Sequence, residues 1–111
     1  MRGEIILENE KCRILIADDE PIERMVISKT IQSYFEEELE IFQAENGREA
    51  IELFQKHDCH IALLDISMPG INGLDAAEEI RKGNPACSII FLTAYDEFDY
   101  AKRAIKVRAL D

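Results

Sequence analysis

Residues able to bind a metal ion or to accept a phosphoryl group follow three of the apolar stretches in this chain. Asp18 and Asp19 follow one stretch, Asp65 ends another, and Thr93 ends a third. A buried carboxylate without a partner is costly, so Asp65 must be paired, bound to a metal or placed in a surface cleft. If the stretches are strands of one parallel sheet, their carboxyl ends form a single cleft that gathers three acids and a hydroxyl.

The chemistry of such a cleft depends on how close its carboxylates lie. If the strands that precede Asp19 and Asp65 are neighbours, about 4.8 Å apart, the two side chains repel each other strongly. A divalent cation relieves this repulsion, and oxygen ligands with open water positions suit Mg²⁺. Such an ion also clamps a phosphoryl group, which needs positioning and charge neutralisation. The pattern therefore predicts Mg²⁺ as cofactor and Asp65 as a nucleophile that accepts phosphate as an acyl phosphate.

Four apolar stretches alternate with four amphipathic segments. The predicted strands are residues 12–17, 39–44, 61–65 and 88–93. The predicted helices are residues 21–35, 45–57, 73–82 and 95–110. This alternation is typical of an α/β fold whose parallel sheet is covered on both faces, so we expect a three-layer, doubly wound sheet.

Local signals place the starts of these helices. Pro21 suits a first helical turn, and Asn46 stands in capping-box relation to Glu49. Asn72 and Asp96 are the expected caps of the two later helices. The first helix is expected to bury a broad stripe composed of two apolar groups, Ile27, Ile31, Tyr34 and Phe35 in one and Ile22, Met25 and Val26 in the other.

Composition excludes several classes of protein. The 111 residues are 47% hydrophobic, enough for one domain with a single core. The formal net charge of −10 argues against nucleic-acid contact by this segment, because phosphate backbones require clustered Lys and Arg. No apolar stretch reaches the length of a membrane span, and the N-terminus differs from a secretory signal. Three cysteines without CxxC spacing predict free, buried thiols and a cytoplasmic location.

Two further motifs have ordinary explanations. The run HDCH, with His57, Cys59 and His60, invites a metal-binding interpretation. Such close neighbours rarely point toward one ion, and no second ligand cluster appears in the sequence, so a loop with an inward cysteine is favoured. Gly70 and Gly73 match no dinucleotide or phosphate-loop pattern, and they are interpreted as turn glycines.

The stretches ILIADDEP, LLDISMPGINGLD and IIFLTAYD together resemble the receiver domain of bacterial two-component response regulators, over about residues 12–111. The resemblance implies a flavodoxin-like (βα)5 fold. It implies that Asp65 is the phosphoacceptor and that Asp18 and Asp19 hold Mg²⁺ together with the backbone carbonyl of Ser67. It also implies that Thr93 is the switch hydroxyl, which turns toward the phosphoryl oxygens.

The same resemblance implies the partners. A sensor histidine kinase supplies the phosphoryl group from a phosphohistidine, and the receiver then shifts between inactive and active populations. The string YDEFDYAKRAIK is similar to receivers that precede an AraC-type module, so a DNA-binding output domain is expected outside this chain. A homodimer is compatible with the resemblance. The expected domain is regulatory, with at most self-catalysed phosphorylation and dephosphorylation.

The chain departs from the family pattern at its end. Receivers carry a lysine after a fifth strand, and this sequence ends at RALD, where that strand would begin. We therefore expect a receiver that lacks the fifth strand and helix, preceded by a tail or extra strand in residues 1–11.

Two alternative functions stay open. One is a pseudo-receiver that binds partners without phosphate. The other is a Mg²⁺-dependent aspartyl phosphatase, disfavoured because Ser67 stands where its acid–base aspartate belongs.

Overall fold

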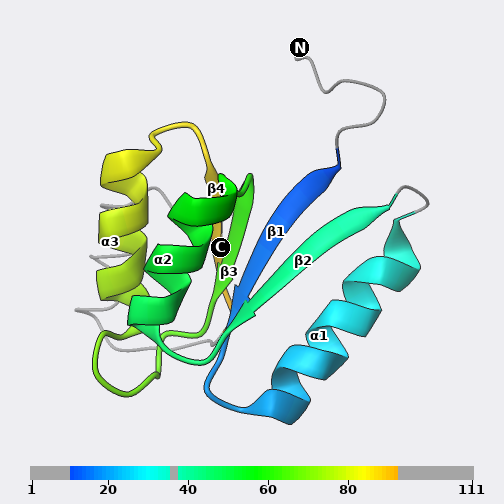
Figure 1. Ribbon diagram of the computed structural model, residues 1–111. Coiled ribbons are helices and arrows are strands. Elements are labelled where there is room, and N and C mark those ends of the chain that lie inside the picture. The colour runs from blue at the N-terminus through cyan, green and yellow to red at the C-terminus, as the bar shows by residue number, and fades with distance from the viewer. Residues whose placement is uncertain (1–10, 36–37, 93–111) are drawn as a thin grey trace.

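The computed structural model describes residues 11–35 and 38–92, which form one parallel sheet and three helices (Figure 1). The strands are β1 Cys12–Ala17, β2 Leu39–Ala44, β3 Ile61–Leu64 and β4 Ser88–Phe91. The helices are α1 Pro21–Tyr34, α2 Gly47–His57 and α3 Gly73–Gly83. The strand order is β2-β1-β3-β4, and all three neighbouring pairs are parallel. The predicted α/β class and doubly wound sheet are confirmed for this part of the chain.

Successive side chains of the inner strands point toward opposite faces of the sheet. In β1, Leu15 and Ala17 join the apolar cluster beneath α2 and α3, whereas Ile14 and Ile16 join the cluster beneath α1. Figure 1 shows α2 and α3 side by side, while α1 packs against β1 and β2. Because helices cover both faces, these strands are apolar at consecutive positions rather than at alternate ones.

Asparagine side chains begin α2 and α3, as predicted. Asn46 Oδ1 accepts a hydrogen bond from the Glu49 N–H at 2.8 Å, and Asn72 Oδ1 accepts one from the Asp75 N–H at 2.9 Å. The carboxylate of Glu49 reaches back one residue further than a standard capping box and accepts from the Glu45 N–H at 2.8 Å. These caps fix the residue at which α2 and α3 each begin, directly after the loops that follow β2 and β3.

The buried stripe of α1 is narrower than the sequence predicts. Ile27 and Ile31 pack against the sheet, but no residue of α1 is fully buried. The large apolar residues of α1 that are exposed are Ile22 at 71%, Met25 at 47%, Val26 at 51% and Tyr34 at 81%, and Phe35, directly after the helix, is 50% exposed. A helix buries only the stripe that faces a neighbour. The described elements packed against α1 are β1 and β2, so the prediction of a broad buried stripe is wrong here.

This contrast predicts very different costs for two truncations. Leu64→Ala empties a fully buried site in β3 and should lower the free energy of unfolding by about 2–5 kcal/mol. Ile22→Ala removes a side chain that is 71% exposed and should change that free energy by less than about 0.5 kcal/mol. Urea denaturation measures both. Equal losses for the two variants would show that the outer side of α1 is covered in solution.

Two predicted elements lie outside the described residues. These are the helix predicted for residues 95–110 and almost all of the tail or extra strand predicted for residues 1–11. Within residues 11–35 and 38–92, none of the helices combines the length and the apolar character needed to cross a bilayer.

Candidate functional site

The carboxyl ends of β1 and β3 lie level with each other in the sheet. Ala17 is in register with Leu64, so Asp18 and Asp65 each follow the last paired residue of their strand. The Asp65 N–H donates to the Ala17 carbonyl at 2.9 Å, and the Asp18 N–H donates to the Ala44 carbonyl at 3.0 Å. These bonds fix the backbone at both acids to the sheet.

Three carboxylates converge at this edge. One oxygen each from Asp18, Asp19 and Asp65 can be chosen so that all three lie within 4.8 Å of one another. Asp18 is only 5% exposed and Asp65 only 7%, whereas Asp19 is exposed. The site therefore has two acids at the edge of the core and one that faces solvent. The sequence-based prediction that these three acids meet is confirmed in geometry, and their chemical roles remain predictions.

Backbone N–H groups hold the two buried carboxylates in place. Asp18 Oδ1 accepts from the Glu20 N–H at 2.9 Å, and Asp65 Oδ1 accepts from the Ser67 N–H at 3.2 Å. Each bond links an acid to the loop that follows it two residues on, an arrangement typical of aspartate in turns. The direction of each carboxylate consequently depends on the position of its own loop.

The electrostatics of the site favour a cation. Burial raises the pKa of the Asp18 carboxyl above its ordinary value, and the negative charges of Asp65 and Asp19 raise it further against the opposing Glu20 hydrogen bond. Three clustered carboxylates, one of them solvent-facing, supply the hard oxygen ligands and open positions that Mg²⁺ prefers. The residues present therefore fit a Mg²⁺ ion.

Charge removal at Asp18 should stabilise the metal-free protein. Because its folded-state pKa is raised, folding takes up a proton between the unfolded and folded pKa values, and stability falls as pH rises through that window. Asp18→Asn keeps the oxygen that accepts from Glu20 and should raise the free energy of unfolding at pH 7.5 in a chelator. The gain should shrink as the pH is lowered. Urea denaturation at several pH values measures it, and a destabilised variant at pH 7.5 would contradict the assignment.

Arg24 is a residue of this site that the sequence reasoning missed. Its Nη1 donates to the Asp18 carbonyl at 2.6 Å, and its Nε donates to Gln43 Oε1 at 3.2 Å. It therefore ties the loop after β1 to the end of β2. Its place near the start of α1, a few residues after the acidic pair, was the signal that could have identified it.

The opposite end of the sheet carries the HDCH run, and its residues do not gather around one point. His57 stacks on Phe42 with ring centroids 4.0 Å apart, His60 Nδ1 accepts from the Arg13 N–H at 3.0 Å, and Cys59 is buried. Burial raises the pKa of the Cys59 thiol to about 11, which makes it a poor nucleophile. Cys59 points into the core, as the loop interpretation predicted, and within the described residues the group of acids suited to a metal consists of the three aspartates.

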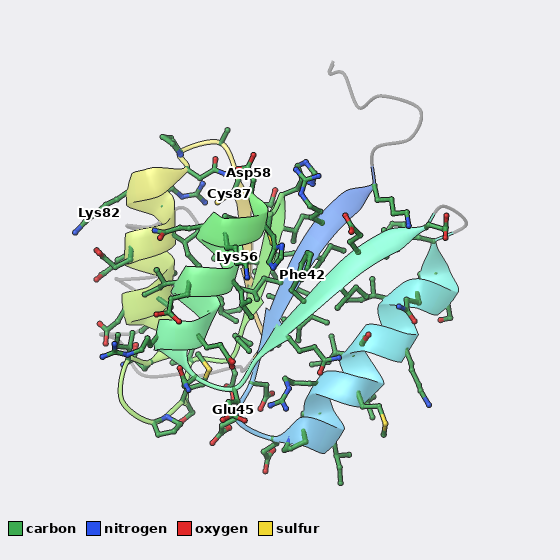
Figure 2. All side chains as sticks on the ribbon, in the orientation of Figure 1. Phe42, Glu45, Lys56, Asp58, Lys82 and Cys87 are labelled. Atoms are coloured by element: carbon green, nitrogen blue, oxygen red, sulfur yellow. The ribbon has the colours of Figure 1, made fainter. Side chains whose placement is uncertain are left out.

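Figure 2 shows labelled residues at both ends of the sheet. Asp58 and Cys87 lie at one end, and Glu45, which follows β2, lies at the other. A hollow of about 390 Å³ lies at the first end and is lined in part by Cys59, His60 and Cys87. None of the residues that line this hollow belongs to the aspartate cluster.

The remaining predicted site residues are placed only in part. Ser67 is exposed in the loop after β3, and its N–H is bonded to the Asp65 carboxylate. Thr93 lies outside the described residues, directly after Leu92, whose N–H donates to the Leu64 carbonyl at 2.9 Å. The roles of the Ser67 carbonyl and the Thr93 hydroxyl remain predictions from the resemblance.

Comparison with known proteins is consistent with this geometry. Residues 14–111 match the family described as response regulator receiver domain. Transcriptional regulatory protein HptR of Staphylococcus aureus is 34% identical over 99 residues, covering 89% of this chain and 38% of HptR. A cyclic di-GMP phosphodiesterase of Thermotoga maritima is 32% identical over 99 residues, covering 88% of this chain and 25% of that protein. The solved REC domain of AraT, a response regulator from Geobacillus stearothermophilus, has a TM-score of 0.77 at 40% identity, covering 90% of this chain and 78% of that one.

The parallel sheet, with the aspartate cluster at its carboxyl edge, defines a flavodoxin-like α/β domain. The chain belongs to the response regulator receiver domain family. Receiver domains are modules of two-component systems, which interact with histidine kinases and act through output domains, and they typically bind Mg²⁺ in an acidic pocket. The chain spans 38% and 25% of the two curated relatives described above.

Proposed function

We propose that this chain is a phosphorylation-dependent signalling switch in which Asp65 accepts a phosphoryl group from a sensor histidine kinase. We assign Mg²⁺ binding to the carboxylates of Asp18, Asp19 and Asp65 and to the backbone carbonyl of Ser67. We assign the role of the switch hydroxyl to the side chain of Thr93. The observation that carries this proposal is the convergence of three carboxylates within 4.8 Å at the ends of adjacent parallel strands.

The proposed transfer needs a carboxylate oxygen with access to solvent and a means of offsetting charge. An Asp65 oxygen attacks phosphorus, the new O–P bond forms, and the bond between phosphorus and the leaving group breaks with its electron pair leaving on that group. Bound Mg²⁺ would neutralise charge on the phosphoryl oxygens. The Ser67 N–H donates to Asp65 Oδ1 at 3.2 Å and thereby fixes the direction of the carboxylate for this attack.

The proposed output is transcription, controlled in the cytoplasm by a DNA-binding domain outside this chain. Support comes from the relative HptR, whose name describes a transcriptional regulatory protein. The Thermotoga maritima relative is named for a different activity, so the output cannot be carried over from similarity of the receiver alone. The AraC-type output suggested by residues 95–106 and a homodimer remain parts of this proposal.

Intact-mass measurement after incubation with Mg²⁺ and acetyl phosphate tests the function. We expect one added phosphoryl group that is removed by hydroxylamine, as an acyl phosphate should be, and no addition when Mg²⁺ is chelated. The same incubation is run on a longer form of the chain that includes the fifth strand and helix of the receiver fold. Absence of phosphate on both folded chains would overturn the switch and favour a pseudo-receiver that binds partners without phosphate.

A further inference from the structure

The β3–α3 loop, residues 66–72, is held between two glycines that each begin a helix. Gly73 is the first residue of α3, and Gly47 is the first residue of α2. Both glycines are buried, and neither has a positive φ. Space, rather than backbone conformation, is therefore the reason for glycine at these two positions.

Gly73 lies directly against the backbone of Asp65. A Cβ at this position would overlap the Asp65 carbonyl oxygen and would lie 2.8 Å from its carbonyl carbon and 2.9 Å from Ile66 Cα. The Gly73 N–H also donates to the Ile66 carbonyl at 3.0 Å. The start of α3 thus touches the main chain of the proposed phosphoacceptor with no room for any side chain between them.

Gly47 holds the same loop from the other helix. A Cβ there would overlap the Ile71 carbonyl oxygen and would lie 2.7 Å from Ile71 Cγ2. The loop consequently fits between α2, which it meets at Ile71, and α3, which it enters at Gly73. Packed interiors have little free volume, so a group added on one side must move the atoms on the other.

The loop also carries the atoms that direct the Asp65 carboxylate. The Ser67 N–H bonded to Asp65 Oδ1 belongs to it, and so does the Ser67 carbonyl assigned to Mg²⁺. We propose that Gly47 is a positioning residue for Asp65: the close contact of α2 with Ile71 sets the loop position and thereby the direction of the carboxylate and of the Ser67 carbonyl. This inference rests on the proposed function, because it names a remote determinant of the same site.

Gly47→Ala, compared with Gly83→Ala, tests the inference. Gly83 ends α3, and the nearest atom to a Cβ there is Gln55 Nε2 at 3.9 Å, so the same substitution meets no obstacle. For each folded variant, the Mg²⁺ dissociation constant is measured by calorimetry well below the unfolding temperature. The rate of acetyl phosphate labelling is measured at saturating Mg²⁺. We expect Gly47→Ala to weaken Mg²⁺ binding and to slow labelling by about tenfold each, within the range known for supporting residues, and Gly83→Ala to change neither by more than about twofold.

Ile71→Ala provides a second test that adds no steric clash. It removes the Cγ2 that lies against Gly47, and it should weaken Mg²⁺ binding in the same direction by a smaller factor. If Gly47→Ala does not fold, this variant decides the question. A folded Gly47→Ala or Ile71→Ala protein with wild-type Mg²⁺ affinity and labelling rate would overturn the inference while leaving the proposed function intact. Failure of the wild-type chain itself to bind Mg²⁺ and to take up phosphate would overturn both.

Discussion

Asp65→Asn should abolish phosphoryl uptake from acetyl phosphate while the fold survives. The amide cannot supply the anionic oxygen that forms an acyl phosphate, and no covalent phosphate can be held at that position. Asparagine has nearly the same volume and retains the oxygen that accepts from the Ser67 N–H, so the packing around this 7% exposed side chain is preserved. Removing one of three clustered negative charges should also leave the metal-free protein at least as stable as the wild type.

Asp58→Asn is the matched control for this experiment. Asp58 is exposed, has φ 51 and lies just before β3, at the opposite end of the strand from Asp65. Asparagine tolerates this left-handed conformation well, so the variant changes the same charge without disturbing the backbone. Intact-mass analysis should find full labelling of Asp58→Asn and none of Asp65→Asn. Retained acyl-phosphate labelling in Asp65→Asn would contradict the assignment of Asp65 as the phosphoacceptor.

Asp19→Ala should weaken Mg²⁺ binding at least as much as Asp18→Ala, and each by about tenfold or more. The two acids differ in their surroundings. One oxygen of Asp18 already accepts from the Glu20 N–H and the residue is buried, whereas Asp19 is the exposed member of the cluster. Of the three acids in the cluster, Asp19 therefore has the carboxylate that is most accessible to an ion in solvent. Calorimetric titration with Mg²⁺ gives the two dissociation constants.

Glu20→Ala is the control that distinguishes the loss of a Mg²⁺ ligand from the loss of a nearby negative charge. It removes one negative charge from the same loop, and its side chain makes no capping hydrogen bond to α1. The backbone N–H that supports Asp18 remains. A change of less than about threefold is expected, because an exposed charge acts on the ion only through solvent. Stronger dependence on Asp18 than on Asp19, or a Glu20→Ala effect as large as either, would contradict the proposed ligand set.

Much of the fold could be predicted because local chemistry and global packing agree. The strand predictions for residues 12–17 and 39–44 match β1 and β2 residue by residue, since both are short apolar segments that lie between helical patterns. Asn46 and Asn72 cap the predicted helices because a cap needs only near neighbours in sequence. The ends of β3 and β4 were less exact: the structure ends them at Leu64 and Phe91.

The burial of α1 could not be predicted in the same way. Periodicity shows which residues share a face of a helix, but it does not show whether another element lies against that face. Ile27 and Ile31 face the sheet, and Ile22 at 71% exposure does not, although all three are equally apolar in the sequence. That outcome depends on neighbours distant in the chain.

The candidate site, too, could be predicted from the sequence only in part. Residue type and position at strand ends were enough to predict that Asp18, Asp19 and Asp65 would meet, because carboxyl ends of parallel strands share one edge. The tertiary structure alone decided that Asp18 is buried with a raised pKa, that Arg24 bonds to Gln43 at the end of β2, and that Gly47 touches the loop of Asp65. Each of these properties depends on distances between segments that lie apart in sequence. The chemistry available to this protein follows from its residue types, whereas the charge state and direction of each group follow from what the folded chain places beside it.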